Sequence, residues 1–361
     1  MLYHLLFPLS EEIVVFNVFR YLTFRTAGAV VTALVLTLVL GPGFIRWLRR
    51  LSIGQNIRVE GPERHQQKAG TPTMGGVLIL FALVLPTLLW ARLDNAYVWL
   101  ALAITALFGA IGLADDFLKV RRGNNQGLTA RTKFLLLALV AAAGGTLLIY
   151  LPHDYNFSPT IAFPFFKTAV FDVGLLYVPF VVLLLTGTSN AVNLTDGLDG
   201  LAIGVTMIAA ATYAIFTYIA GNSVVAGYLQ FPYVRDVGEV TVMCGALVGA
   251  SLGFLWFNAH PAEVFMGDVG SLAIGGALGT FAVLSKQEIV LVLVGGVLVM
   301  VTLSVIAQVT SFKLTGRRVL RMAPLHHHFE LIGWAESKII VRFWILAILF
   351  ALIGLSTLKL R

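Results

Sequence analysis

The chain has 361 residues, of which 58% are hydrophobic and 12% are charged. A soluble globular protein carries roughly 25% charged residues, so the composition excludes an ordinary soluble fold and indicates a polytopic membrane protein. The net charge of +7 does not indicate a nucleic-acid partner, because Lys and Arg gather in the cytoplasmic loops of membrane proteins. The single cysteine, Cys244, excludes an intrachain disulfide.

Apolar runs of about 20 residues, the length that crosses a bilayer, recur along the whole sequence. We expect an all-α polytopic membrane protein with about ten transmembrane helices, at 22–47, 73–92, 96–114, 133–152, 170–189, 197–220, 238–257, 264–285, 288–312 and 339–358. Residues 1–20 are expected to form a short amphipathic segment outside the membrane, and 153–168 a small hairpin at its surface. Because the interspan loops are short, 1–361 is expected to be a single domain.

The connections between the spans alternate in charge. Those after the first, third and ninth expected spans are rich in Lys and Arg, whereas the opposite loops carry little more than Arg92, Lys167, Arg235 and Lys286. The positive-inside rule then places both termini in the periplasm and the basic connections in the cytoplasm. The polar motifs described next all fall on the cytoplasmic side, which predicts an active site on that face.

A polar stretch, T-G-T-S-N-A-V-N-L-T-D-G-L-D-G-L-A at 186–202, separates two of these apolar runs. Asn190, Asn193, Asp196 and Asp199 recur in it at every third position, without a Lys or Arg to neutralise the acids. Residues three apart lie close together on a helix face, and buried carboxylates are costly unless a cation or a hydrogen-bond donor meets them. The stretch therefore indicates either a ligand-binding wall or a helix-capping loop.

Three further acids flank expected spans. Asp115 and Asp116 end the third span, where they repel each other and face the negative end of the helix dipole, and Asp268 begins the eighth. A divalent cation such as Mg²⁺, which prefers carboxylate and phosphate oxygens, would relieve this repulsion. The alternatives are solvated charges bridged to Lys119 for the pair, and a helix N-cap for Asp268.

Two other loops carry polar motifs. In G-T-P-T-M-G-G at 70–76, the hydroxyl of Thr73 and the backbone N–H groups lie near the start of a span, where anions are favoured. The loop R-M-A-P-L-H-H-H-F-E carries His326, His327 and His328. Adjacent side chains diverge, and no further Cys or His has zinc spacing, so phosphate or sugar contacts are favoured over zinc. Together, acids, cations and amides on one face are typical of phosphoryl transfer.

These motifs, in this order, resemble those of the polyprenyl-phosphate N-acetylhexosamine-1-phosphate transferases. The segments that carry the resemblance are G-T-P-T-M-G-G at 70–76, D-D-F-L-K at 115–119, N-A-V-N-L-T-D-G-L-D-G-L at 190–201, F-M-G-D-V-G-S at 265–271 and M-A-P-L-H-H-H-F-E at 322–330. The resemblance covers essentially the whole chain, and the histidine loop is typical of the muramoyl-pentapeptide branch of this superfamily.

The resemblance implies a Mg²⁺-dependent reaction of UDP-N-acetylmuramoyl-pentapeptide with undecaprenyl phosphate, giving lipid I and UMP in peptidoglycan synthesis. It implies a multi-pass protein of the bacterial inner (cytoplasmic) membrane, in contact with membrane lipids and compatible with a homodimer. Asp268 and Asp115 would bind the metal, Asp115 would assist or deprotonate the lipid phosphate, and Asp116 would belong to the same catalytic cluster. The implied substrate-binding residues are Lys68, Asn193, Asp196, Asp199 and Phe265 for the nucleotide, with Lys119, Lys133, Asn190, Asn258, Gln308, His326, His327 and His328 as further candidates.

One position departs from the family pattern. An acid usually precedes T-L-S-V-I, whereas Val301 stands there in this chain. The change either leaves a partner of that acid unpaired or removes a costly intramembrane charge, so no family role is carried over to this position. Two alternatives stay open, namely a related transferase that uses UDP-N-acetylglucosamine and, from a different class, an ion-coupled transporter, since intramembrane acids also mark ion pathways. The residues also leave open whether transfer is direct or proceeds through a covalent aspartyl intermediate.

Overall fold

The computed structural model describes residues 1–51, 70–122, 126–150, 157–166 and 170–359. Within these ranges, nine helices are long and apolar enough to cross a membrane. They are α2 (Leu22–Arg50), α4 (Ala96–Arg122), α5 (Ala130–Ile149), α6 (Tyr177–Thr195, extended by the short turn η5 at Gly174–Leu176), α7 (Leu201–Ala220), α9 (Val240–Asn258), α10 (Gly267–Leu284), α12 (Gly296–Thr315) and α14 (Glu336–Ser356). A shorter apolar helix, α3 (Gly76–Trp90), accounts for the expected span at 73–92. The all-α polytopic fold is confirmed.

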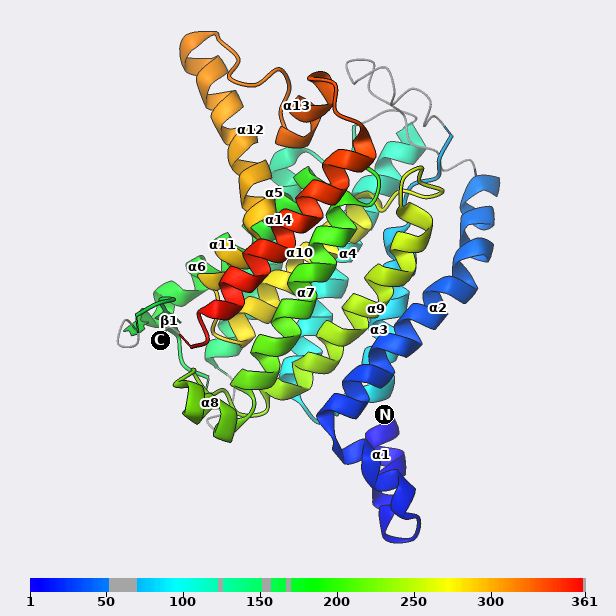
Figure 1. Cartoon of the computed structure of the whole chain (residues 1–361), viewed down its shortest axis with the longest axis vertical. Coiled ribbons are helices and arrows are strands. Elements are labelled where there is room, and N and C mark those ends of the chain that lie inside the picture. The colour runs from blue at the N-terminus through cyan, green and yellow to red at the C-terminus, as the bar shows by residue number, and fades with distance from the viewer. Residues whose placement is uncertain (52–69, 123–125, 151–156, 167–169, 360–361) are drawn as a thin grey trace.

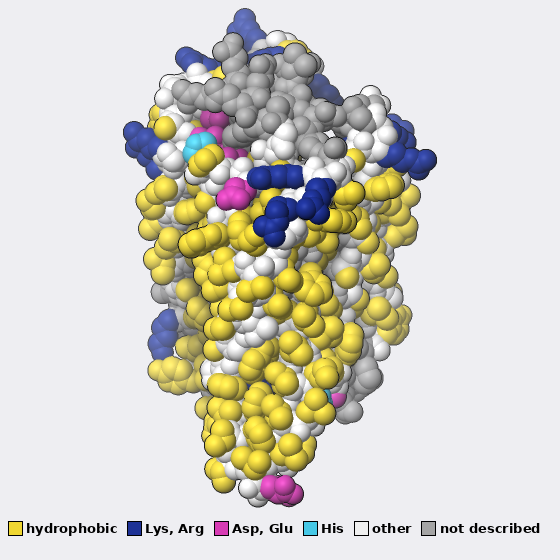
Figure 2. Space-filling view, turned by 90° about the vertical axis from the view of Figure 1, so that its right-hand side faces the viewer, with side chains coloured by type: hydrophobic (Ala, Val, Ile, Leu, Met, Phe, Trp, Pro, Cys, Tyr) yellow, Lys and Arg dark blue, Asp and Glu magenta, His cyan; other side chains and the backbone are white. Residues whose placement is uncertain are grey.

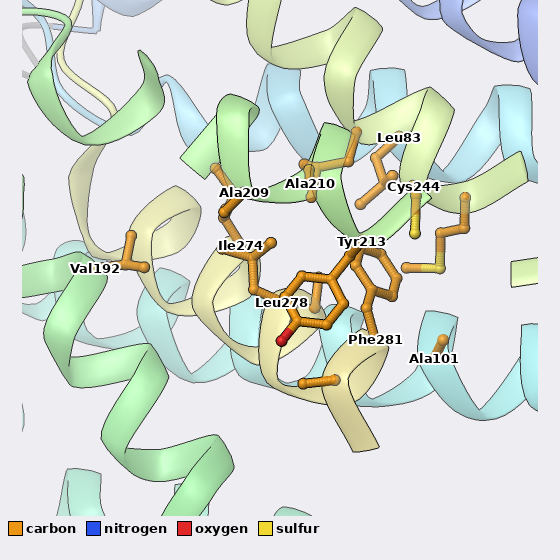
Figure 3. Packing of buried hydrophobic residues seen from close by; sticks show 14 of the residues in the cluster. Leu83, Ala101, Val192, Ala209, Ala210, Tyr213, Cys244, Ile274, Leu278 and Phe281 are labelled. Carbon is orange, nitrogen blue, oxygen red and sulfur yellow. The ribbon is translucent and has the colours of Figure 1, made fainter. Parts of the chain in front are cut away.

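Helix α10 lies at the centre of the bundle and packs against α3, α4, α6 and α7. From Val269 to Leu284 all of its residues are buried. Figure 3 shows Ile274, Leu278 and Phe281 of α10 packed among side chains of the neighbouring helices, including Tyr213 of α7. Glycine allows the closest approach, since a methyl group on Gly76 would overlap the backbone of Gly270. The first turn of α10, which carries Asp268, is thereby held tightly against α3.

The boundaries of several elements differ from those expected. The run at 170–189 begins with a strand, β2 (Val170–Asp172), paired antiparallel with β1 (Thr160–Ala162), so α6 starts later and continues to Thr195. The β1–β2 pair is a hairpin, but its second strand lies beyond the expected range of 153–168, and its placement at the membrane surface stays a prediction. Helix α4 continues to Arg122, and the run at 288–312 is broken at Gly295 into α11 (Val290–Val294) and α12. The apolar runs predicted the membrane spans, but they did not predict the residues at which the helical hydrogen bonding begins and ends.

The molecule is a helical bundle with a wide apolar belt. Figure 2 shows hydrophobic side chains covering the middle of the face that carries α2, with Lys and Arg gathered toward its upper end. The short elements α1 (Leu2–Leu6), η1 (Pro8–Glu11) and η2 (Val14–Arg20) lie at the lower end in Figure 1, whereas α14 ends at the left, just below the middle of the view. Helix α13 (Leu325–Leu331) lies at the upper end. The periplasmic placement of the two termini stays a prediction.

Candidate active site

Three carboxylates from two helices meet at the upper end of the bundle. Asp115 and Asp116 of α4 and Asp268 of α10 each offer an oxygen, and these oxygens lie within 4.8 Å of one another. Asp268 is the second residue of α10 and not its N-cap, which is Met266. Because α4 runs on to Arg122, the pair lies inside the helix and both acids are buried. We call Asp115, Asp116 and Asp268 the acid cluster.

Two lysines neutralise most of the acid cluster. The Lys119 ammonium lies 2.6 Å from Asp115 Oδ2, 3.3 Å from Asp116 Oδ1 and 2.8 Å from Asp268 Oδ2. Lys133, from the first turns of α5, donates to the same Asp268 oxygen at 2.7 Å. Three carboxylates against two ammonium groups leave one formal negative charge (−3 + 2 = −1). Because both lysine side chains are only partly buried, they remain accessible to an anion entering from the polar end.

Backbone and amide donors orient the acids. The N–H of Leu128 donates to Asp115 Oδ1 at 2.7 Å, and the N–H of Val269 donates to Asp116 Oδ2 at 3.2 Å. The amide of Asn193, on α6, donates to Asp268 Oδ1 at 2.6 Å and to Ser271 Oγ at 2.8 Å. Four helices therefore determine the geometry of the cluster, and Asn193 belongs to it directly.

The G-T-P-T-M-G-G loop lies beside the acid cluster. Gly75 N–H donates to the carbonyl of Phe265 at 2.9 Å, and Phe265 N–H donates to the carbonyl of Pro72 at 2.8 Å. Phe265 is half-buried next to α10. The surroundings of Gly267 contain both Asp116 Oδ2 and Thr73 Oγ1, so Thr73 lies next to the acids. Lys68, predicted for the nucleotide pocket, lies outside the described residues.

Asp196 and Asp199 have different surroundings although both follow α6. Burial, with the charges of Asp268, Asp116 and Asp199 as smaller causes, raises the pKa of Asp196 to about 8. Asp199 instead turns toward the loop after α9. Its Oδ2 accepts from Ala262 N–H at 3.1 Å and lies 3.2 Å from His260 Nδ1. The two acids of the 186–202 stretch therefore do not share one face.

The histidine run packs against the turn at 196–200. A Cβ on Gly197 would overlap the ring of His326 and lie 3.0 Å from Nε2 of His327. His326 is fully buried, and His327 Nδ1 lies 2.6 Å from Glu330 Oε2. His328 is directed to the other side, where its Nδ1 accepts from Arg321 N–H at 3.2 Å. The structure thus brings two of the three histidines to this turn.

Three other predicted residues use their side chains within the protein. Asn258 accepts from Gly200 N–H at 3.0 Å and donates to the carbonyl of Val264 at 2.8 Å. Gln308 holds the loop after α12 by donating to the carbonyl of Leu320 and accepting two backbone N–H groups. The amide of Asn190 donates to a carbonyl of its own helix at 2.7 Å. These three residues lie near the polar end without joining the acid cluster.

Some residues of the site were not singled out from the sequence. His260 and Glu336, which contact Asp199, are two of them. His260 and Glu336 stand outside the polar stretch and have no spacing pattern, so only the fold brings them together. Val301, where the family pattern has an acid, is fully buried in α12 among apolar residues, an environment that suits valine without a charged partner.

The donor set of the acid cluster fits a hard divalent cation. Three carboxylate oxygens lie close enough to converge on one ion, and the Lys119 ammonium, within 3.3 Å of all three acids, shows that a cation is accommodated there. Carboxylate oxygens completed by phosphate oxygens are the ligands that Mg²⁺ prefers. A second group, Asp199, His260 and Glu336, also brings its ligand atoms within 4.8 Å of one another.

Comparison with known proteins identifies the family of the chain. A family model described as glycosyl transferase family 4 matches residues 98–286, and one described as phospho-N-acetylmuramoyl-pentapeptide-transferase signature 1 matches residues 68–80. Three proteins named phospho-N-acetylmuramoyl-pentapeptide-transferase match over 100% of this chain and 100% of their own length. They come from Nitratidesulfovibrio vulgaris (60% identical over 362 residues), Citrifermentans bemidjiense (59% over 361) and Oleidesulfovibrio alaskensis (57% over 362). The chain therefore belongs to the phospho-N-acetylmuramoyl-pentapeptide-transferase family.

Proposed function

We propose that the protein transfers phospho-N-acetylmuramoyl-pentapeptide from UDP-N-acetylmuramoyl-pentapeptide to undecaprenyl phosphate, giving lipid I and UMP. The observation that carries this proposal is the acid cluster with Lys119 and Lys133, held where the apolar bundle ends. A membrane-embedded lipid phosphate and a water-soluble nucleotide sugar can meet only at such a boundary. The chain acts as a phosphoglycosyl transferase in the bacterial cytoplasmic membrane, with its site on the cytoplasmic face.

The reaction exchanges one phosphorus–oxygen bond for another. An oxygen of the lipid phosphate attacks the β-phosphorus of the nucleotide sugar, the bond to the bridging oxygen breaks, and UMP leaves with that electron pair. A proton on the lipid phosphate would pass to Asp115, whose carboxylate is buried beside Lys119. Because the attacking phosphate is already an anion, orientation and charge neutralisation provide most of the rate enhancement.

The position of each residue indicates its role in the reaction. Lys119 and Lys133 bring positive charge to the diphosphate, and Asn193 holds Asp268 from the α6 side. Mg²⁺ would be held by Asp268 with Asp115 and Asp116, and when bound it lowers the charge on the diphosphate and on the leaving UMP. Phe265, Thr73, Asp196 and Asp199 line the proposed nucleotide pocket from different sides, and Lys68 is assigned to it from the family resemblance alone. His326 and His327 close it from the side of α13.

A transfer assay tests the proposal. Labelled UDP-N-acetylmuramoyl-pentapeptide, undecaprenyl phosphate and Mg²⁺ are expected to give a lipid-linked product and UMP in stoichiometric amounts. Folded protein in detergent that forms no lipid-linked product would contradict it. The same assay with UDP-N-acetylglucosamine as the donor tests the alternative: product formed from this donor alone would identify the related UDP-N-acetylglucosamine transferase. Single-turnover analysis without undecaprenyl phosphate distinguishes direct attack, in which no UMP is released, from a covalent aspartyl intermediate.

We also propose that the protein forms a homodimer. Light scattering of the detergent-solubilised protein tests this oligomeric state.

A further inference from the structure

The turn at 196–200 is held by acceptors from distant parts of the chain. Asp199 N–H donates to Glu336 Oε1 at 3.1 Å, and Gly200 N–H donates to Asn258 Oδ1 at 3.0 Å. Gly200 has φ +76°, a region that favours glycine. A backbone turn of this kind keeps one geometry only while its N–H groups have fixed partners. Glu336, the first residue of α14, is one of those partners.

Asp199 extends the same contacts to the loop at 259–264. Its Oδ2 accepts from Ala262 N–H at 3.1 Å and lies 3.2 Å from His260 Nδ1. Glu336 Oε2 lies 3.5 Å from the same histidine nitrogen. His260 therefore sits between the two carboxylates, and the turn, the loop and the start of α14 form one connected unit.

This unit continues into the wall of the proposed nucleotide pocket. The loop at 259–264 leads directly into Phe265, whose backbone pairs with Pro72 and Gly75. A shift of the loop would move Phe265 with it, whereas the first turn of α10 is held separately by its contacts with α3 and Asn193. The same loop is tied to the turn through Asn258, which donates to Val264. Displacing Glu336 therefore changes two walls of the pocket, at Asp199 and at Phe265.

We propose that Glu336 is a positioning residue for the nucleotide sugar, acting with His260 through Asp199 and the turn at 196–200. The inference rests on the proposed function, because that function makes the turn and Phe265 part of the nucleotide pocket. The Glu336 side chain is 10% exposed and is engaged by a backbone N–H, so it acts through Asp199 and not by touching the reacting phosphates. Loss of Glu336 would weaken nucleotide binding and leave the acid cluster unchanged.

A small cavity lies beside the unit, on the side of Asp199 and His260. The cavity has a volume of about 140 Å³ and is lined by Asp199, His260 and Trp344, among others. Water in this cavity would offer the Asp199 N–H a replacement acceptor once Glu336 is removed, which reduces the cost of the substitution. The expected consequence is a looser turn in a folded protein.

The test is a kinetic comparison of Glu336→Ala, Glu336→Gln and His260→Ala in the full-length protein. Misplaced binding groups cost up to about 100-fold, so we expect Glu336→Ala to raise KM for the nucleotide sugar about 10- to 100-fold, with kcat changed less than about threefold. Glu336→Gln keeps a side-chain oxygen acceptor and should restore KM to near the wild-type value. His260→Ala should raise KM in the same direction. Glu263→Ala, at an exposed position of the same loop, is the matched control.

The outcomes separate this inference from the proposed function. Wild-type protein that makes no lipid-linked product contradicts the proposed function itself. If the wild type turns over and folded Glu336→Ala keeps KM unchanged, or loses kcat alone, Glu336 is not a positioning residue. A Glu336→Gln variant as defective in KM as Glu336→Ala would also overturn the inference. If Glu336→Ala does not fold, His260→Ala carries the test, and a KM in folded His260→Ala equal to that of Glu263→Ala overturns the inference.

Discussion

The ammonium of Lys119 lies 2.8 Å from the carboxylate of Asp268, although the two residues are 149 positions apart. The same ammonium also contacts Asp115 and Asp116 from its own helix. A single cation thereby joins α4 to the first turn of α10. Three acids can therefore lie close together at the end of the folded helical bundle. The nearby positive charge offsets the free-energy cost of their mutual repulsion and of their desolvation.

Removing Lys133 tests the role of the lysines in charge neutralisation. Lys133→Ala leaves Lys119 in the cluster but takes away the second contact to Asp268. Preorganised charge at a transferring phosphoryl group is commonly worth about 100- to 1000-fold in kcat, so a loss of that order is expected. Steady-state kinetics of lipid-linked product formation measure it. Arg131→Ala, at an exposed position on the same helix, is the control, and equal rates for the two variants would contradict the role of Lys133.

Metal removal tests the use of the acid cluster as a cation site. Chelation with EDTA should abolish turnover, and added Mg²⁺ should restore it, because three carboxylates and the substrate phosphates then share the ion. In Asp116→Asn the Mg²⁺ concentration for half-maximal rate should rise, since one anionic ligand is lost. Turnover that persists in excess EDTA after dialysis would show that the acids act without a divalent cation.

The raised pKa of Asp196 predicts a pH-dependent stability. Its ordinary value is 3.8, and burial with nearby acids raises its pKa to about 8. Between these values the unfolded chain has lost a proton that the folded chain keeps, so stability falls as the pH rises through this window. Asn carries no charge, and the stability gain from Asp196→Asn should therefore grow from about pH 4 to about pH 8 and then level off. Thermal unfolding in detergent with EDTA measures it, and a gain independent of pH would contradict the assigned protonation.

At the other end of the bundle, Arg25 of α2 and Glu239 of the short turn η6 (Val237–Glu239) form a buried ion pair. Two hydrogen bonds of 2.6 Å join them, and Glu239 Oε2 also accepts from Arg92 N–H at 3.1 Å. Removing one partner of such a pair leaves an uncompensated charge and costs about 3–5 kcal/mol. Glu239→Ala should therefore lower the unfolding temperature markedly, whereas Asp94→Ala, in an exposed pair, should lower it little. Comparable shifts in the two variants would contradict the buried-pair account.

Much of the fold followed from the sequence because membrane spans depend on composition over about 20 residues. The all-α polytopic class and the position of each span were predictable, and so was the gathering of Asp115, Asp116 and Asp268 near one end. The residues at which the helices begin and end were not predictable. Residues 170–172 pair as a strand with 160–162, and the helix at 177–195 includes residues 186–195 of the polar stretch. Local hydrogen bonding decides these ends, and apolar content does not report it.

The details of the site depend on contacts between distant segments. A spacing of three predicted that Asp196 and Asp199 would share a face, but the helix ends at Thr195 and Gly200 takes a positive φ, so their surroundings differ. His260 and Glu336 lie 76 positions apart in sequence (336 − 260) and meet only because the loop after α9 reaches the start of α14. Such pairings leave no periodic pattern in the sequence from which they might be read.

The most direct test of the central claim compares the wild type with Asp268→Ala in the transfer assay. We expect wild-type protein to form lipid-linked phospho-N-acetylmuramoyl-pentapeptide with release of UMP. Folded Asp268→Ala should lose at least about 1000-fold in kcat, since Asp268 contacts both lysines and would also bind the proposed metal. Near-wild-type turnover by folded Asp268→Ala would contradict the assignment of the acid cluster as the reaction centre.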